Sequence, residues 1–277
     1  MLQRGVPELP EVETVRRMLE PAMLGSRFRR VIVNRPNLRI PLPQHFTERL
    51  RGKTVQAVSR RGKYLTLTLS SGETLVMHLG MSGWFHVARI GDRSRQSDPH
   101  DHVAFVMSSG QTVLYNDPRR FGFMDLAERH QLGEYRSLKV MGPEPLSPDF
   151  NAASLALACR RRNIPIKVAL LDQGVVAGVG NIYASEALHH AQISPLRKAS
   201  TLATASGAPK ETARRLSASI KSVLTSAIRR RESPYGSARF KVYERDGEAC
   251  LRKGCGGTIK KLQQAARSTF YCTECQR

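Results

Sequence analysis

The segment "CLRKGCGGTIKKLQQAARSTFYCTEC", residues 250–275, carries the strongest indication of fold in the chain. Cys250 and Cys255 form one pair, Cys272 and Cys275 form a second, and 16 residues separate the two pairs. The stretches "TIKKL" and "STFYC" between them predict the two strands of a β-hairpin. Four thiolates at this spacing can surround one Zn²⁺ tetrahedrally, and so short a segment has little other core. We predict one structural zinc ion bound by all four cysteines; four unrelated thiols or a redox pair are the alternatives.

The whole chain is strongly basic. Among its 277 residues, 44 are Lys or Arg and 23 are Asp or Glu, so the formal net charge is +21. This excess favours nucleic acid as a partner, ahead of an anionic membrane or of solubility alone. The hairpin itself contributes Lys253, Lys260, Lys261 and Arg267, which also favours nucleic acid.

Targeting signals are missing from the sequence pattern. No apolar stretch reaches the length of about 18 residues that a spanning helix needs. Pro7, Glu8, Pro10 and Glu11 stand where a signal peptide would be apolar. We therefore expect a cytoplasmic protein without a membrane partner, in which cysteines serve metal binding before disulfides. The fifth cysteine, Cys159, is predicted to be a buried core thiol.

Two different sequence patterns, one in each half of the chain, predict an α+β fold. The first half alternates apolar and polar residues, which predicts the hairpins of an antiparallel β-sandwich. The predicted strands are 64–69, 74–79, 102–107 and 112–116. A helix precedes them, because Val12, Val15, Leu19 and Met23 keep helical spacing.

The second half of the chain has sequence patterns typical of helices. "MGPEPLSPDF" (141–150), with three prolines and one glycine, predicts a linker. Ala/Leu-rich helical patterns follow at 153–159, 181–191 and 210–231, and 200–209 is predicted to be a loop.

The glycine-rich stretch "GVVAGVGNIYASEAL" (174–188) predicts an anion site. Its glycines are not spaced as G-x-G-x-x-G, which argues against a dinucleotide loop. A tight turn at a helix start presents free backbone N–H groups, which suit a DNA phosphate, and Asn181 can add a side-chain contact. The alternative is a helix entry that is tight only for packing.

A second candidate is the loop in "NDPRRFGFMD" (116–125). After the turn at Asp117–Pro118, it projects Arg119, Arg120 and Phe121. An aromatic ring can wedge into a base stack while arginines hold phosphates or base edges. A solvated turn with a core Phe explains the same residues.

Together, seven stretches resemble the formamidopyrimidine-DNA glycosylase and endonuclease VIII family of base-excision repair enzymes. They are "PELPEVETVRR", "RRGKYL", "HLGMSG", "NDPRRFG", "GPEPL", "GVGNIYASEAL" and "RSTFYCTECQ", in the expected order from residue 7 to the C-terminus. The resemblance implies an N-terminal catalytic β-sandwich with a flanking helix (7–140) and a linker (141–152). A helix–two-turn–helix domain (153–240) and a zinc-finger β-hairpin (241–277) follow.

The resemblance also implies a mechanism. Pro7 is the nucleophile, through the secondary amine of an N-terminal proline, and Glu8 is the adjacent acid. Excision of an oxidised or ring-opened purine leaves an abasic site, which β- and then δ-elimination cleave through a Schiff base. Lys63 and Arg267 match the residues that assist the two eliminations while contacting phosphates.

The implied partner is double-stranded DNA that contains an oxidised base or an abasic site. Met81, Arg119 and Phe121 match the trio that fills the void left by the extruded base. His78, His100, Arg162 and Asn181 match phosphate-contacting positions, and Arg120 is a further contact. The resemblance implies a monomer that works at the nucleoid. His189 and His190 match nothing functional and are interpreted as helix surface or packing.

The sequence departs from the family pattern at its beginning. "MLQRG" precedes Val6, where the family has its initiator Met, so Pro7 as written is acylated. We expect either that Val6 marks the true start or that a peptidase trims the chain to Pro7. If neither happens, the chain is a non-catalytic protein that binds damaged DNA.

Two further departures lie in the second half. Only "ESPYGSAR" (232–239) stands where purine-specific members carry a longer loop. This short stretch argues against a preference for 8-oxoguanine and leaves formamidopyrimidines or oxidised pyrimidines as substrates. The first cysteine pair is C-x4-C rather than C-x2-C, which zinc tolerates. A zinc-ribbon scaffold without lesion specificity would explain the hairpin but not "PELPEVE".

Overall fold

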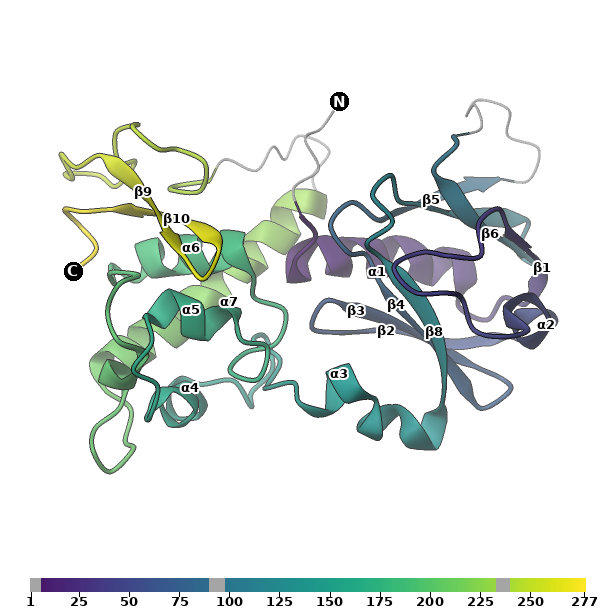
Figure 1. Ribbon diagram of the computed structural model, residues 1–277, viewed down its shortest axis with the longest axis horizontal. Coiled ribbons are helices and arrows are strands. Elements are labelled where there is room, and N and C mark those ends of the chain that lie inside the picture. The colour runs from purple at the N-terminus through teal and green to yellow at the C-terminus, as the bar shows by residue number, and fades with distance from the viewer. Residues whose placement is uncertain (1–5, 90–97, 233–239) are drawn as a thin grey trace. The chain divides into compact units, whose positions relative to one another are not determined.

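The computed structural model describes residues 6–89, 98–232 and 240–277. The chain divides into two compact units (Figure 1). One unit comprises Val6, Pro7 and Glu11–Lys139, and the other comprises Val140–Arg277. The short segment Glu8–Pro10 belongs to the second unit, although the rest of its helix belongs to the first.

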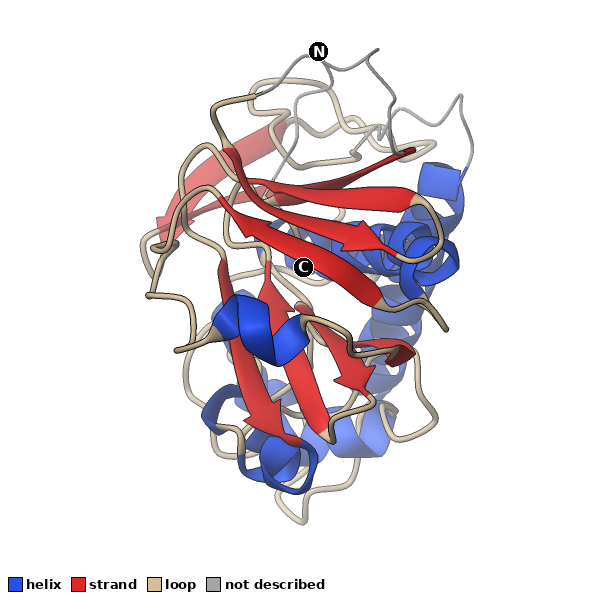
Figure 2. Ribbon diagram, turned by 90° about the vertical axis from the view of Figure 1, so that its right-hand side faces the viewer, coloured by secondary structure: helices blue, strands red, loops and turns tan. Residues whose placement is uncertain are grey.

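The first unit is built from two four-stranded antiparallel sheets (Figure 2). One sheet has the order β1 (Phe28–Val33), β6 (Asp101–Met107), β7 (Gln111–Asn116) and β5 (Trp84–Arg89). The other has the order β2 (Val55–Arg61), β3 (Tyr64–Leu69), β4 (Glu73–His78) and β8 (Phe123–Glu128). The predicted strands coincide with β3, β4, β6 and β7 to within one residue at each end.

One hydrophobic core joins the two sheets. Leu65 and Leu67 of β3 are fully buried in it, together with Phe28 and Phe105 from the other sheet. The rings of these two phenylalanines meet edge to face at 5.5 Å. Both sheets therefore bury one face against the other, which confirms the predicted sandwich.

Helix α1 (Leu9–Met23) flanks the sandwich. Val12, Val15, Leu19 and Met23 are at most 1% exposed, as their helical spacing predicts. Shorter helical segments complete the unit; they are α2 (Phe46–Leu50), the 3₁₀ helix η1 (Arg129–Glu134) and α3 (Arg136–Lys139).

The second unit is helical before its hairpin. Its helices are α4 (Ala152–Cys159), α5 (Ile166–Leu171), α6 (Asn181–His190) and α7 (Glu211–Glu232). The predicted loop at 200–209 begins inside a short 3₁₀ helix, η2 (Ala199–Leu202), because Ala199 and Leu202 are buried in the helical core. Cys159 is fully buried in the same core, as predicted.

The C-terminal hairpin pairs β9 (Ile259–Gln264) with β10 (Arg267–Cys272). Its own apolar cluster is small and centres on Val242, Ile259 and Phe270. In the described part of the chain, no helix is both long enough and apolar enough to cross a membrane.

Candidate active site and zinc centre

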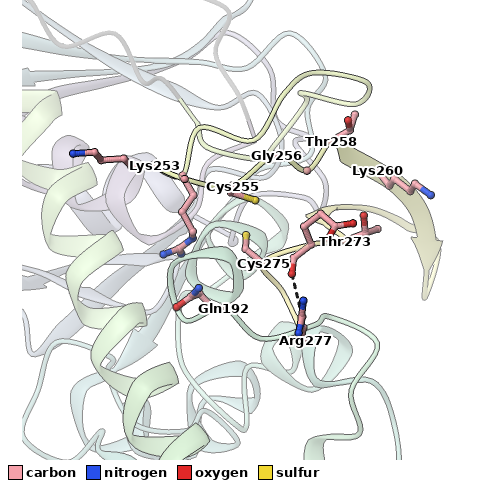
Figure 3. Close-up of a pocket in the computed structure, with 13 residues that line it drawn as sticks. Gln192, Lys253, Cys255, Gly256, Thr258, Lys260, Thr273, Cys275 and Arg277 are labelled. Atoms are coloured by element: carbon pink, nitrogen blue, oxygen red, sulfur yellow. Dashed lines mark hydrogen bonds between the residues drawn. The ribbon is translucent and has the colours of Figure 1, made fainter.

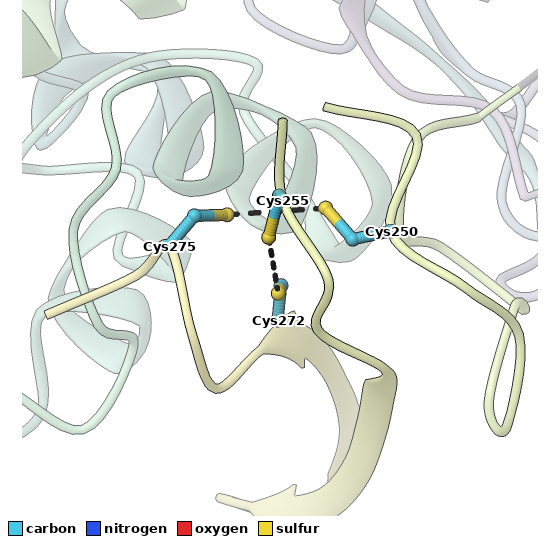
Figure 4. Close-up of side chains that lie close together, drawn as sticks. All are labelled: Cys250, Cys255, Cys272 and Cys275. Carbon is cyan, nitrogen blue, oxygen red and sulfur yellow. Dashed lines mark hydrogen bonds between the residues drawn. The ribbon is translucent and has the colours of Figure 1, made fainter. Parts of the chain in front are cut away.

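The four hairpin cysteines converge on one point (Figure 4). Their sulfur atoms all lie within 4.8 Å of one another. The Cys250 and Cys275 sulfurs are 3.9 Å apart, and those of Cys255 and Cys272 are 3.7 Å apart. Tetrahedral zinc with bonds of about 2.3 Å requires sulfurs about 3.8 Å apart. The residues therefore fit a structural zinc ion with four protein ligands, as predicted.

A pocket of about 790 Å³ opens beside the zinc centre (Figure 3). Cys255 and Cys275 reach its wall, whereas Cys250 and Cys272 are buried. Its wall also carries four cationic side chains, from Arg252, Lys253, Lys260 and Arg277. This face of the zinc hairpin is thus positively charged, which suits a polyanion.

The glycine-rich turn before α6 holds an anion, as its sequence predicts, but that anion is part of the protein. The Glu8 carboxylate accepts hydrogen bonds from the backbone N–H groups of Gly180 (3.0 Å), Ile182 (2.8 Å) and Tyr183 (3.3 Å). These amides are occupied, so the expectation that they bind a DNA phosphate is wrong for them. The sequence could not reveal this, because 172 residues separate Glu8 from Gly180.

Close packing explains one glycine of this turn. Gly178 has φ +77°, and a Cβ there would lie 2.7 Å from Leu9 Cδ1. The Leu9 N–H also donates to the Gly178 carbonyl at 3.1 Å. A side chain at 178 would thus displace the start of α1 and with it Glu8.

Asn181, the first residue of α6, lies in a polar cluster around Lys167. The Lys167 ammonium donates to Asn181 Oδ1 (2.5 Å), the Ser268 carbonyl (3.0 Å) and Thr269 Oγ1 (2.8 Å). The Asn181 side-chain amide donates to the same Ser268 carbonyl at 3.0 Å. Arg267, which is exposed at the start of β10, directly precedes Ser268 in the chain.

Lys167 is a polar residue that the sequence did not single out. Its side chain is fully buried. Burial lowers the pKa of Lys167 to about 8, with the Arg267 charge acting in the same direction and the Glu8 carboxylate opposing it. It stands in an apolar helical pattern, so only its three acceptors, distant in sequence, reveal its role in joining α5, α6 and β10.

In the first unit, Lys63 is the last turn residue before β3, and His78 ends β4. The His78 ring stacks on Phe123 at 5.8 Å, and its Nδ1 accepts the Gly80 N–H at 3.0 Å. Burial lowers the pKa of His78 to about 4, and the charges of Lys63 and Arg39 add to this effect. His78 is therefore neutral at pH 7.

The loops that carry Met81 and the Arg119–Phe121 stretch lie against each other in this unit. A Cβ at Gly80 would lie 2.3 Å from the Phe121 backbone carbon, so only glycine fits. The Arg119 N–H donates to Ser82 Oγ at 3.2 Å. The Arg119 guanidinium lies 4.7 Å from the centre of the Phe121 ring, which is 42% exposed.

Asp117 holds the second loop in place. Its buried carboxylate accepts the Ser82 hydroxyl, the Tyr115 hydroxyl and the Gly122 N–H. The stretch from 119 to 121 thus projects from a rigid base, and the alternative of a core Phe does not hold, because Phe121 is exposed.

The remaining predicted residues are placed as follows. His100 is exposed in the turn before β6, and Arg120 is exposed with φ +55°. Arg162 pairs with Asp172 at 2.6 Å. The structure gathers Lys63, His78, Met81, His100, Arg119, Arg120 and Phe121 in the first unit. It gathers Glu8, Arg162, Asn181, Arg267 and the four cysteines in the second, with Pro7 directly before Glu8.

Family models match nearly the whole chain. The formamidopyrimidine-DNA glycosylase N-terminal domain matches residues 6–124, the formamidopyrimidine-DNA glycosylase H2TH domain matches 141–237, and the zinc finger found in FPG and IleRS matches 247–277. The fold and the site therefore define a zinc-containing DNA glycosylase of DNA repair.

Individual relatives match this chain in sequence over their full length. The formamidopyrimidine-DNA glycosylases of Rhodopseudomonas palustris (strain BisA53) and Beijerinckia indica subsp. indica are 49% and 48% identical, over 98% of this chain and 100% of theirs. The Lactococcus lactis enzyme, solved non-covalently bound to DNA with an AP site, is 34% identical with a TM-score of 0.85. That match covers 98% of this chain and 100% of the other. The chain belongs to the formamidopyrimidine-DNA glycosylase family.

Proposed function

We propose that the protein is a bifunctional enzyme, which excises an oxidised or ring-opened purine and then cleaves the abasic site. The observation that carries this proposal is the fixed position of Glu8, whose carboxylate is held by three N–H groups at the start of α6. Pro7, the residue directly before it, supplies a secondary amine once it is the first residue of the chain.

The proposed first step is a displacement at C1′. Hydrogen bonds to the carboxylate favour its ionised form, so Glu8 accepts a proton from the Pro7 ammonium, whose pKa is about 8 when free. The amine then forms a bond to C1′ as the bond to the base breaks, and the departing base takes up the proton that the attacking nitrogen loses. Glu8 returns the proton to the ring oxygen, and the open sugar remains as an iminium on Pro7.

The proposed eliminations follow from this iminium. It makes the C2′ proton acidic, and loss of that proton expels the 3′ phosphate; a second elimination expels the 5′ phosphate. Lys63 and Arg267 carry positive charges that offset the charge of the departing phosphates. Water then releases the sugar and restores the Pro7 amine.

Met81, Arg119 and Phe121 are proposed to fill the space of the extruded nucleotide, because a stacked base hides its C1′. His78, His100, Arg120, Arg162 and Asn181 are proposed as DNA contacts, with Arg162 exchanging its Asp172 partner for a phosphate. We also propose that the catalytic β-sandwich spans 7–140, the linker 141–152, the helix–two-turn–helix domain 153–240 and the zinc-finger β-hairpin 241–277.

Borohydride reduction with abasic-site DNA tests the mechanism. We expect a covalent adduct whose digest places the sugar on Pro7, and no adduct with a chain that keeps residues 1–6. Strand cleavage by a chain whose Pro7 nitrogen remains in a peptide bond would overturn the proposal and favour another nucleophile. Damaged-DNA binding without any adduct would support the alternative of a non-catalytic binding protein.

The start of the working chain is part of the same proposal. We propose that residues 1–6 are absent from the mature enzyme, through initiation at Val6 and removal of the initiator Met or through trimming. The intact mass of protein from its native host tests this. Full retention of Met1 in active material would contradict it.

The preferred lesion is a separate proposal. We propose formamidopyrimidines, with oxidised pyrimidines as the second candidate, because the short 232–239 stretch stands where purine-specific members of the family carry a longer loop. Positions 233–239 lie outside the described residues. The Lactococcus lactis enzyme has been solved both with Fapy-dG DNA and with oxidised-pyrimidine DNA. Grafting a long loop should raise the relative rate on 8-oxoguanine, and unchanged relative rates would count against this. We further propose a monomer that acts on chromosomal DNA in the cytoplasm.

A further inference from the structure

His189 contacts the zinc centre from outside the hairpin. It lies in the last turn of α6 and is 4% exposed. Its Nε2 atom lies 3.4 Å from Cys250 Sγ, which is itself buried. This is hydrogen-bond distance for a sulfur acceptor, and it joins a helix residue to a zinc ligand 61 positions later in the chain.

The chemistry of the ligand determines the direction of this hydrogen bond. A zinc-bound cysteine is a thiolate, which has no proton and can only accept. The imidazole must therefore carry its proton on Nε2 and donate it to Cys250. Such a donor spreads the negative charge of the sulfur and holds the ligand in the geometry that zinc requires.

Neighbouring contacts fix the two partners. The Arg252 guanidinium donates to the carbonyl of His189 at 2.7 Å and to that of His190 at 3.3 Å. One turn earlier on α6, the Glu186 carboxylate accepts the N–H groups of Lys241, Val242 and Tyr243 at 2.9–3.0 Å. The helix is thus bound to the zinc hairpin on both sides of His189, so the imidazole has little freedom to turn away.

We propose that His189 is an outer-sphere residue of the zinc centre, which donates its Nε2–H to the Cys250 thiolate and couples zinc affinity to the end of α6. Of the other contacts, those of Arg252 join its guanidinium to α6 carbonyls, and those of Glu186 join its carboxylate to backbone N–H groups. Among the contacts described above, that of His189 alone reaches a ligand atom.

Three variants test the proposal. His189→Phe fills the space without a donor, and His189→Gln restores an N–H at the position of Nε2. The matched control is His190→Phe, because the His190 ring contacts Ser219 Oγ at 2.9 Å and no sulfur. In a competition with a chromogenic chelator, we expect His189→Phe to bind zinc about 10- to 100-fold more weakly. His189→Gln and His190→Phe should remain near the wild type.

Two spectroscopic readouts separate this role from packing. With Co²⁺ in place of zinc, the sulfur-to-metal charge-transfer bands should shift in His189→Phe and stay in place in His190→Phe. In the zinc-loaded wild-type chain, ¹⁵N NMR should place the His189 proton on Nε2, a measurement that needs no variant to fold. Equal zinc affinities for the two Phe variants, or a proton on Nδ1, would overturn the proposal.

Discussion

The first amides of α6 have no capping side chain of their own, because the N-cap residue is Gly180. Glu8 supplies the missing acceptor from the other end of the chain, and its charge lies where the helix dipole favours an anion. One carboxylate therefore caps a helix and also belongs to the residue that directly follows Pro7 in the chain.

Glu8→Gln should affect stability and chemistry to different degrees. Loss of the charge weakens the cap, and we expect the free energy of unfolding to fall by about 1–2 kcal/mol. Base excision should fall by about 10²- to 10⁴-fold, because a neutral amide cannot move a proton. Urea titration and single-turnover excision measure the two effects. Glu20→Gln, a more exposed carboxylate of α1 paired with Arg16, is the control and should leave excision unchanged.

His78 should make stability depend on pH. Its pKa is lowered to about 4 in the folded chain and is about 6.5 in an unfolded one. Between these values the unfolded chain binds a proton that the folded chain does not, so the free energy of unfolding falls as the pH falls from about 6.5 to about 4.

His78→Asn should remove this contribution while keeping an acceptor for the Gly80 N–H. Urea unfolding of both proteins across this window measures the difference between them. We expect the two stabilities to converge as the pH falls and to stay parallel above about pH 7. A constant difference over the whole range would contradict the assignment to His78.

At the scale of elements, the β9–β10 hairpin contains an unusual turn. Ala265 and Ala266 have φ +46° and +57°, a left-handed conformation that costs an L-residue about 1–2 kcal/mol. Asn-Gly is the preferred pair for such a two-residue turn. The strain lies directly before Arg267, so the conformation that positions this arginine is maintained by strand pairing and zinc rather than by the turn residues.

Replacing Ala265 by Asn and Ala266 by Gly should therefore raise the free energy of unfolding of the second unit by about 1 kcal/mol or more. Denaturant unfolding measures the change. Ala153→Gly, at an exposed position in the first turn of α4, is the control and should destabilise by up to about 1 kcal/mol. If the double replacement at 265 and 266 lowers the free energy of unfolding as Ala153→Gly does, the turn is not strained.

At the scale of the whole molecule, the net charge of +21 should govern DNA binding. Each phosphate contact by Lys or Arg releases counterions, so the logarithm of the binding constant falls linearly with that of the salt concentration. The four cationic contacts proposed above, Lys63, Arg120, Arg162 and Arg267, predict a slope of about −3 to −4.

Arg267→Ala should make this slope shallower by about one, whereas Arg214→Ala, on exposed α7 surface beside Glu211, should not change it. Binding isotherms on abasic-site DNA at several salt concentrations measure both. An unchanged slope in Arg267→Ala would remove this residue from the DNA contacts.

Local patterns in the sequence predicted most of the elements. The alternation of 64–69 coincides with β3, and the spacing of Val12, Val15 and Leu19 identifies the buried side of α1, because each pattern depends only on neighbouring residues. The loop that projects Arg119 and Phe121 could also be predicted, since Asp117–Pro118 is a local turn signal. The role of Lys167 could not be predicted, because an apolar helical pattern does not show which acceptors will surround its ammonium group.

The sequence by itself determined the fold class, the zinc ligands and the family, because strand alternation, helical spacing and cysteine spacing are properties of short segments. Only the tertiary structure decided that the anion at the start of α6 is Glu8, that Lys167 joins α5 to β10, and that His189 lies on Cys250. The physical reason is that each of these contacts pairs residues from distant segments. Buried polar groups need such partners, but no local sequence pattern indicates which residues they will be.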